Sequence, residues 1–309
     1  MPSLLERINK YLHYGGLLKY PRRLFKYFMY AIYPIVIEIW KIPSIKTIEE
    51  TLLKIKDKKC SIARFGDGEV LYIVDKLNLP FQVYDERLAN KLKIILKAEL
   101  TGMIVGLPDG YRSIEAYERP IQVFWRSQIS FTYPRFQKYL NLEKQYWNAN
   151  ITRLYYGFKD QSNSNRFFDL FRTIWEKRDV LLIEGEKSRL GMGNDLFASA
   201  NGVERILGPA HNAYSRFDDL LNEGLKHDKR KLVLIALGPT AKALSYEFTR
   251  NGYQAIDIGN LDLEYEWYLM GAKERVKIEG KYTSEVKGGR NVAEANDVLY
   301  NEQIIKKLF

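Results

Sequence analysis

LVLIALGPTAKALSYEFTR, which occupies residues 232–250 of this 309-residue chain, carries the clearest indication of fold class in the sequence. Its leading apolar residues predict a strand over Leu232–Leu237, buried on both faces because it has no polar side. A Gly-Pro pair then precedes a helix predicted over Ala241–Arg250, since proline suits the first turn of a helix. Another strand is predicted at Gln254–Ile258. Strand, helix and strand in this order are typical of a parallel α/β sheet.

The same alternation extends toward the N-terminus, where apolar residues at helical spacing alternate with short apolar runs. In chain order they predict a helix at Ile48–Ile55, a strand at Cys60–Ala63, a helix at Asp85–Leu100, a strand at Met103–Leu107, a helix at Phe167–Ile174, a strand at Val180–Ile183 and a helix at Tyr214–Leu225. Residues 110–150 are rich in aromatic side chains and poor in strand signals, which predicts a helical insertion. We therefore expect an α/β fold with a mainly parallel sheet and helices on both faces.

The composition is that of a folded domain, with 46% hydrophobic and 28% charged residues. Cys60 is the only cysteine, which excludes an intramolecular disulfide and a cysteine-based zinc site. For the same reason we expect a reducing, cytoplasmic compartment. A Gly-x-Ser-x-Gly elbow is missing, which argues against a hydrolase with a covalent intermediate, and the Rossmann dinucleotide fingerprint is missing as well.

The first 44 residues are predicted to form a basic amphipathic helical leader ahead of a domain at residues 45–309. Residues 1–45 carry seven Lys or Arg and two Glu, so half of the net charge of +10 lies in about a seventh of the chain. Apolar residues recur there at helical spacing, and Pro21 separates two predicted helices. The apolar run Met29–Trp40 has 12 residues, too few for a membrane-crossing helix, which needs about 20.

This leader points to an anionic partner. We expect residues 1–40 to contact a membrane surface, which places the protein in the cytoplasm and peripherally at the inner membrane face. A docking helix or oligomer contact is the main alternative, and binding of nucleic acid is a third. A second basic region, at about residues 272–309, forms the C-terminal tail of the domain.

Ligands of open parallel sheets bind beyond the carboxyl ends of the strands, and the first such loop is Arg64-Phe65-Gly66-Asp67-Gly68-Glu69. Gly66 and Gly68 let the backbone approach a ligand closely. Asp67 and Glu69 supply hard oxygen ligands of the kind that Mg²⁺ or Mn²⁺ prefers, and such an ion is commonly shared with substrate phosphates. Arg64 suits a bidentate contact with a phosphate. A plain polar turn, with Asp67 as a helix cap, is the alternative interpretation.

The second loop follows the strand at Val180–Ile183 and concentrates charge and glycine in residues 184–195. Its candidate ligand-binding residues are Arg189, Gly191, Gly193, Asn194 and Asp195. Glu184, at the start of the loop, is a candidate for activating an acceptor hydroxyl. An ordinary solvated loop is the alternative, because charge-rich surface loops are common.

Two further loops follow the last two strands. The third opens a helix, whose free N–H groups and dipole favour an anion, although the full P-loop spacing is missing. Its candidate nucleotide or phosphate contacts are Gly238, Pro239, Thr240 and Lys242. The fourth loop carries Asp262 and Glu264, either of which suits a general base. A plain turn and a charged helix start are the respective alternatives.

Taken together, four ordered segments resemble those of the GT-D type bacterial glycosyltransferases. The matching segments are Ala63–Glu69, Ser188–Phe197, Ala236–Lys242 and Gln254–Trp267. The resemblance covers roughly residues 45–270 and does not include the leader.

The resemblance implies a Rossmann-like domain that binds a UDP-sugar through a divalent metal. It implies that Asp67 and Glu69 form an Asp-x-Glu element that holds Mn²⁺ or Mg²⁺. It further implies transfer of a hexose to a glycan acceptor, lipid-linked or protein-linked, in the synthesis of cell-surface polysaccharide or glycoprotein. The chemistry of the residues agrees, because a metal, an arginine and helix N-terminal amides stabilise the charge of a departing diphosphate.

Two other functions stay open at this stage. One is a transferase on the same fold that modifies polysaccharide with a different activated donor. The other is a basic nucleic-acid-binding protein, for which residues 272–290 offer six basic and three acidic side chains. Carboxylates concentrated at strand ends repel phosphate unless a metal intervenes, so we expect no nucleic-acid partner.

Overall fold

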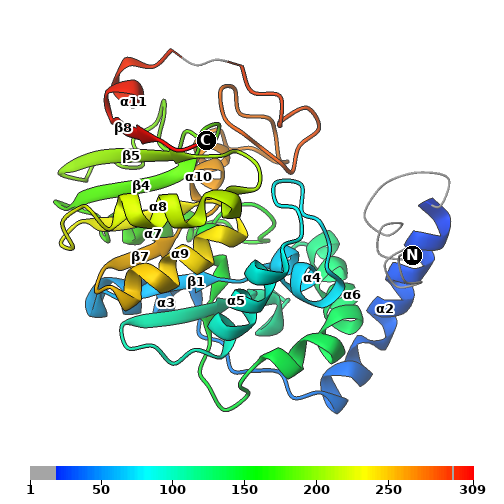
Figure 1. The fold of residues 1–309 in the computed structure, drawn as a ribbon. Coiled ribbons are helices and arrows are strands. Elements are labelled where there is room, and N and C mark those ends of the chain that lie inside the picture. Colours follow the sequence, from blue (N-terminus) through cyan, green and yellow to red (C-terminus); the bar gives the residue numbers. More distant parts are fainter. Residues whose placement is uncertain (1–18, 294–295) are drawn as a thin grey trace.

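The computed structural model describes residues 19–293 and 296–309, which form a single eight-stranded sheet flanked by helices (Figure 1). The order of strands across the sheet is β3-β2-β1-β7-β6-β4-β5-β8, and neighbouring strands are parallel. Their bounds are β1 Ser61–Arg64, β2 Met103–Leu107, β3 Trp147–Asn148, β4 Asp179–Gly185, β5 Gly202–Gly208, β6 Leu232–Ala236, β7 Gln254–Asp257 and β8 Ile304–Lys307. The predicted fold class is confirmed.

Helices cover both faces of this sheet, as Figure 1 shows. Their bounds are α2 Lys19–Ile39, α3 Ile48–Lys58, α4 Asp67–Asp75, α5 Glu86–Lys97, α6 Arg119–Phe136, α7 Ser164–Arg172, α8 Phe217–Gly224, α9 Pro239–Arg250, α10 Leu261–Leu269 and α11 Val298–Glu302. Short 3₁₀ turns lie between some of them, at Asp109–Tyr111, Gln137–Tyr139, Ala149–Thr152 and Ala213–Arg216. The helix α6 confirms that the segment 110–150 is largely helical. The same segment also contains the short strand β3.

The central strands are mostly apolar because both faces of the sheet are packed. In β6, Leu232 and Leu234 belong to a core shared with Trp175, whereas Val233 and Ile235 pack with residues from α8 and α9 on the other face. All four β6 side chains are fully buried. Burial on both sides explains why the sequence showed an unbroken apolar run instead of alternation.

Several elements were missed or misplaced by the sequence prediction. The strand β5 was missed because Glu204 and Arg205 interrupt its apolar run, and Arg205 is buried only because it pairs with Glu184. Pro21 was expected to separate two helices, but it lies in the first turn of α2, where proline is tolerated. The earlier predicted helix falls at residues 1–18, outside the described residues.

The helix α2 packs against α6 along one side and leaves apolar side chains exposed along the other. Leu24, Phe28 and Ile39 are each more than half exposed. Within residues 19–293 and 296–309, no helix combines the length and apolar character that spanning a membrane requires. The boundary predicted near residue 44 stays a prediction.

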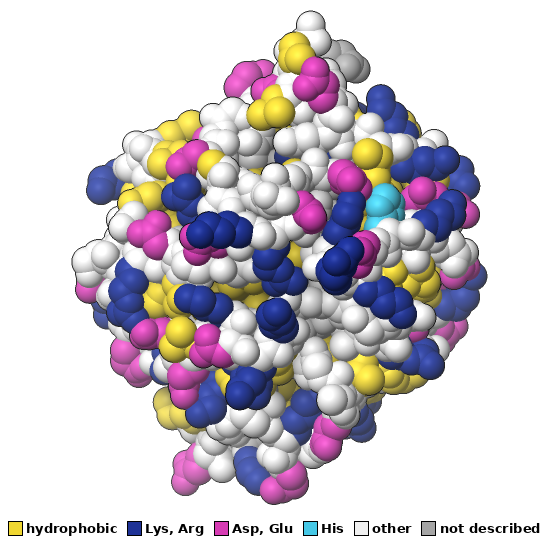
Figure 2. Space-filling view, turned by 90° about the vertical axis from the view of Figure 1, so that its left-hand side faces the viewer, with side chains coloured by type: hydrophobic (Ala, Val, Ile, Leu, Met, Phe, Trp, Pro, Cys, Tyr) yellow, Lys and Arg dark blue, Asp and Glu magenta, His cyan; other side chains and the backbone are white. Residues whose placement is uncertain are grey.

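Charged side chains are arranged differently at the amino and carboxyl ends of the strands. The amino ends of the strands lie on the face that Figure 2 shows, where Lys and Arg side chains are dispersed among acidic ones. Lys59, Lys177 and Lys229 are exposed there, just ahead of β1, β4 and β6. The carboxyl ends of the same strands open instead into a cavity, where charged side chains converge.

Candidate functional site

A cavity of about 730 Å³ lies beyond the carboxyl ends of β1, β4, β5, β6 and β7. The loops that follow these strands line it, together with α6 and the C-terminal segment 275–290. In the sheet β1 lies beside β7, which comes late in the chain, whereas β1 is connected onward to β2 on its other side. Such a change of direction opens a crevice at the strand ends, and the cavity lies at the end of the sheet where the ligand site was predicted.

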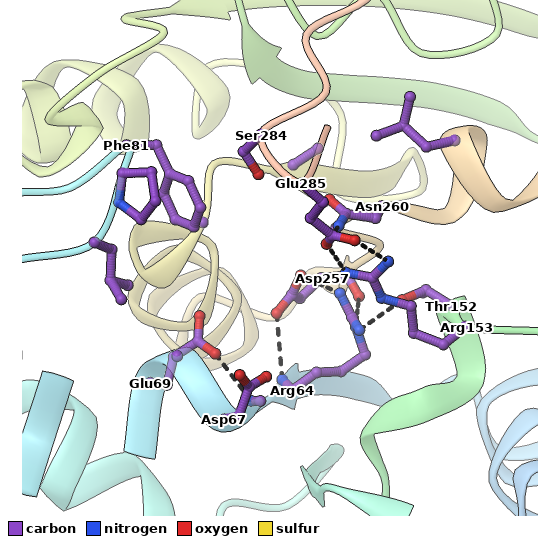
Figure 3. A pocket seen from close by; sticks show the side chains of 18 of the residues that line it. Arg64, Asp67, Glu69, Phe81, Thr152, Arg153, Asp257, Asn260, Ser284 and Glu285 are labelled. Atoms are coloured by element: carbon purple, nitrogen blue, oxygen red, sulfur yellow. Dashed lines mark hydrogen bonds and ion pairs between the residues drawn. The ribbon is translucent and has the colours of Figure 1, made fainter. Parts of the chain in front are cut away.

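The first predicted loop places both of its acids at this cavity (Figure 3). Asp67 is the first residue of α4, and Gly66 is its N-cap. The Glu69 carboxylate accepts a hydrogen bond from the Gly66 amide at 2.9 Å and forms an ion pair with Lys242 at 2.8 Å. Gly68 also lines the cavity. The N-cap of α4 is thus Gly66, so the alternative with Asp67 as the helix cap is wrong, and the loop faces the cavity.

Asp67 differs from Glu69 in having no partner. Its half-buried side chain makes no hydrogen bond or ion pair with another side chain among the residues that the structure describes. Burial raises the pKa of the Asp67 carboxyl above its usual range, and the neighbouring charge of Glu69 raises it further. A carboxylate in such a position favours a bound cation.

Arg64 has its donors already engaged by the protein. Its Nε donates to the Asp257 carbonyl at 2.6 Å, and one terminal nitrogen donates to the Asp257 carboxylate at 3.0 Å. The other terminal nitrogen donates to the Ala149 carbonyl and to the Thr152 hydroxyl. The arginine lines the cavity while it ties β1 to β7 and to the turn after β3.

The third loop brings Gly238 and Lys242 to the cavity. Lys242 lies between two carboxylates, 2.8 Å from that of Glu69 and 3.1 Å from that of Asp257. Gly238 has φ of 53°, and a Cβ there would meet the Phe81 ring at 2.6 Å, so only glycine fits. Pro239 and Thr240 lie buried in the first turn of α9 and do not line the cavity.

The second loop, by contrast, contributes mainly to structure. Glu184 is fully buried, accepting the Leu190 amide at 2.8 Å, the Arg205 guanidinium at 2.6 Å and the Tyr300 hydroxyl at 3.2 Å. Burial raises the pKa of the Glu184 carboxyl, although Arg205 opposes it. Glu184 does not line the cavity. Its predicted role in activating an acceptor stays a prediction.

The remaining candidates of this loop also turn away from the cavity. Arg189 donates to two backbone carbonyls of the C-terminal segment, and Asn194 donates to Asp262 at 2.8 Å. The other three candidates, which likewise do not line the cavity, are Gly191, Gly193 and Asp195. The loop reaches the cavity instead through Gly185, Ser188 and Leu190.

The two acids of the fourth loop are both held by neighbouring donors. Asp262 lines the cavity and accepts the Gly191 amide at 2.8 Å and the Lys281 ammonium at 2.7 Å, besides the Asn194 contact. Glu264 is fully buried away from the cavity, where it accepts the amides of Tyr155 and Tyr156. Both carboxylates are thus tied into the fold, and Glu264 does not reach an acceptor in the cavity.

Sequence reasoning missed the basic groups on the far wall of the cavity. Arg153, Arg275 and Arg290 line it, and Glu285 pairs with the first two (Figure 3). Burial alone would raise the pKa of the Glu285 carboxyl, but the two arginines outweigh it and lower the pKa. Arg275 and Arg290 belong to the basic stretch 272–290 noted in the sequence, but no pattern there or around Arg153 places an arginine at the cavity.

Charges in the cavity are nearly all paired. Its five basic residues are Arg64, Arg153, Lys242, Arg275 and Arg290, and its five acids are Asp67, Glu69, Asp257, Asp262 and Glu285. Within the described part of the chain, ion pairs engage all of them except Asp67 and Arg290. These two side chains are therefore available to an added ligand.

Comparison with known proteins identifies the family. The family model described as "Glycosyltransferase GT-D fold" matches residues 62–286. The chain belongs to this family. It is 38% identical over 265 residues to "Glycosyltransferase GlyD" of Streptococcus pneumoniae serotype 4, covering 85% of this chain and 32% of the relative. It is 34% identical over 268 residues to "Probable glycosyl transferase Gly" of Streptococcus gordonii, covering 86% of this chain and 39% of the relative. The chain thus spans only about a third of the length of these curated relatives.

Solved structures agree with this assignment. One, described as "The highly conserved domain of unknown function 1792 has a distinct glycosyltransferase fold", is 34% identical. It aligns with a TM-score of 0.83 over 90% of this chain and all of that chain. "A New Glycosyltransferase (DUF1792) from Streptococcus sanguinis" is 33% identical, with a TM-score of 0.82 over 86% of this chain and all of that chain.

The part of the chain matched by the GT-D model contains all four predicted loops but ends before Arg290. Across residues 19–293 and 296–309 of this GT-D domain, no three His, Cys, Asp or Glu side chains are grouped as metal ligands. Asp67 and Glu69 supply two carboxylates. Mg²⁺ is commonly bound by one or two carboxylates together with substrate phosphates.

Proposed function

We propose that this chain is a metal-dependent glycosyltransferase that moves a hexose from a UDP-sugar to a glycan acceptor. One observation carries the proposal: Asp67, which has no side-chain partner among the described residues, lies in a cavity that the chain builds around three helix N-termini. The residues Gly66, Gly238 and Asn260 precede α4, α9 and α10, and all three line this cavity. The proposal rests also on membership of the GT-D family.

The helix N-termini supply the affinity for a diphosphate. The first amides of a helix lack internal partners, and the helix dipole places partial positive charge at the same end. The diphosphate of a nucleotide-sugar is the part of the donor that this arrangement favours. The charge that develops on it as the sugar leaves is stabilised by the same fixed groups, without reorganisation.

Asp67 and Glu69 are the residues we propose to hold Mn²⁺ or Mg²⁺. Asp67 fits because its carboxylate has no competing partner in the described chain. Glu69 fits as the second ligand at the cost of its ion pair with Lys242, which would retain Asp257. The ion, when bound, neutralises charge on the leaving diphosphate.

The N-terminal leader and α2 bear on the acceptor and on where the enzyme works. We propose a lipid-linked or protein-linked glycan of the cell surface, with the enzyme working in the cytoplasm at the inner membrane face through residues 1–40. The exposed apolar side chains of α2 and the basic charge of the leader support this placement.

The test is a screen of UDP-sugars for donor hydrolysis, read as UDP release with Mn²⁺ and after addition of EDTA. We expect one donor to be turned over, with EDTA abolishing the release. The variants Asp67→Ala and Glu69→Ala should fail with that donor. Asp195→Ala is a matched control, because it removes an acid from a glycine-rich loop outside the cavity. Full UDP release without divalent ions, or from both cavity variants, would refute the metal assignment.

A further inference from the structure

The wall of the cavity opposite Asp67 is formed by residues 280–293, a segment we call the strap (Figure 3). Both of its ends are tied to the body of the protein. Lys281 is buried and lies 2.7 Å from the carboxylates of both Asp262 and Glu266. Arg189 donates to the carbonyls of Gly280 and Ala293, each at 2.9 Å. These contacts fix the strap at its two ends.

Between these anchors the strap makes a tight turn. The Thr283 amide donates to the Gly289 carbonyl at 2.8 Å, and the Gly289 amide donates to the Val286 carbonyl at 3.0 Å. Gly288 has φ of 77°, and a Cβ on Gly289 would overlap the backbone of Thr283. Both positions therefore require glycine. The turn fixes the backbone just ahead of Arg290.

Arg290 is exposed and lines both the main cavity and an adjoining one of about 420 Å³. It makes no ion pair or hydrogen bond with another side chain in the part of the chain that the structure describes. Its neighbour Arg153 pairs with Glu264 and Glu285, and Arg275 pairs with Glu285, so two carboxylates balance the charge of these two arginines. Arg290 is thus the basic group of the strap that lines the main cavity without a side-chain partner among the described residues.

From this placement we propose that Arg290 binds the diphosphate of the donor, on the side of it away from Asp67. The inference rests on the proposed function and deepens it. Charge balance supports the arrangement. Asp67, Glu69 and Asp257 carry three negative charges, and Arg64 and Lys242 carry two positive ones. A divalent cation, a diphosphate with two negative charges and the Arg290 guanidinium bring the sum to zero. A guanidinium also matches phosphate oxygens with two parallel N–H donors, which an ammonium cannot do.

Binding of UDP and of uridine, measured by titration calorimetry with and without Mn²⁺, tests the assignment. Arg290→Gln should weaken UDP binding about 10- to 100-fold, the range expected for losing a charged hydrogen bond. Uridine binding should not change, because it has no phosphate. Arg290→Lys should recover only part of the loss, since it restores the charge without the paired donors.

The matched control is Lys287→Gln, which removes one positive charge from the same strap but lies outside the main cavity. It should bind UDP as the unchanged protein does. If Arg290→Gln binds UDP within twofold of the unchanged protein, or if Lys287→Gln weakens it equally, the assignment of Arg290 is wrong while the proposed function stands. If the unchanged protein binds no UDP at all, both proposals fail.

Discussion

The loops at residues 64–69 and 184–195 look alike in sequence and act differently in the structure. Each follows a buried strand, and each combines glycine with several acids and at least one base. The first turns both of its acids toward the cavity, whereas the second turns Glu184 and Asp195 away from it. Composition and placement after a strand were therefore insufficient to separate a cavity-lining loop from a structural one.

The two loops differ in how many hydrogen-bond donors their carboxylates already have within the protein. Glu184 accepts three hydrogen bonds inside the protein, and two of the donors, Arg205 and Tyr300, lie far along the chain. Asp67 accepts none from another side chain among the described residues. A buried acid with all its donors present stabilises the fold, and an acid lacking them is free to bind a ligand.

The largest effect should follow from breaking the structural loop. Glu184→Ala leaves Arg205 buried without its partner, which typically costs about 3–5 kcal/mol of stability. Chemical denaturation should show this loss as a lower midpoint. Glu184→Gln keeps the shape and can still accept from Tyr300, so it should lose less. A Glu184→Ala protein of unchanged stability would contradict the structural assignment.

The next effect concerns the binding loop and should appear in turnover. Asp67→Asn removes the charge that we propose holds the metal, so UDP release should fall by about 100-fold or more, as for other lost electrostatic contacts in a transition state. The fold should be unharmed, because no partner is orphaned. Unfolding by denaturant, followed at several pH values in parallel with turnover, separates the two effects.

The pH dependence of this variant has a definite sign. The folded-state pKa of Asp67 is raised, so the carboxyl favours the fold while protonated, and this contribution is lost as the pH rises through the folded pKa. At neutral pH, Asp67→Asn should therefore be at least as stable as the unchanged protein. The difference should vanish below the ordinary Asp range, near pH 4. A loss of stability at neutral pH would show that Asp67 has a structural role.

A backbone change in the second loop should have an intermediate effect. Gly191 has φ of 74°, and a Cβ there would approach the Phe197 ring to 2.5 Å. Gly191→Ala should cost about 1–3 kcal/mol through strain and overpacking. Gly193→Ala is the matched control, since its φ of 75° is equally unusual but nothing lies near its Cβ. The difference in unfolding free energy between the two variants measures the contact with Phe197.

The sheet could be predicted from the sequence more completely than the candidate site. The strand β2 was predicted with its observed bounds, Met103–Leu107, because an apolar run between polar ends depends only on local composition. The first loop was placed at the cavity for a similar reason, since the end of a parallel strand marks the ligand edge. The strap and Arg290 could not be predicted, because their position depends on distant contacts such as that of Lys281 with Asp262.

The smallest effect is expected for Asp195, in the loop at residues 184–195. The stability that Asp195 contributes should depend on pH in the direction opposite to that of Asp67. The hydrogen bond from Tyr265 is the main cause that lowers the pKa of Asp195, with Arg172 contributing. Its stabilisation is present above the ordinary Asp range and is lost as the pH falls through the lowered folded pKa. The side chain is 57% exposed, so solvent screening limits its ion pair to about 0.2–1 kcal/mol.

Asp195→Asn should therefore lose a little stability at neutral pH, a difference that fades in acid, while turnover stays unchanged. Denaturation curves of Asp67→Asn and Asp195→Asn, recorded side by side from about pH 3 to 7, give the sharpest comparison of the two loops. We expect the two substitutions to change the unfolding free energy at neutral pH with opposite signs. The reason is that Asp195 is held by its partners, whereas Asp67 has no side-chain partner among the described residues. Equal signs would mean that the two loops do not differ in the way their hydrogen bonds indicate.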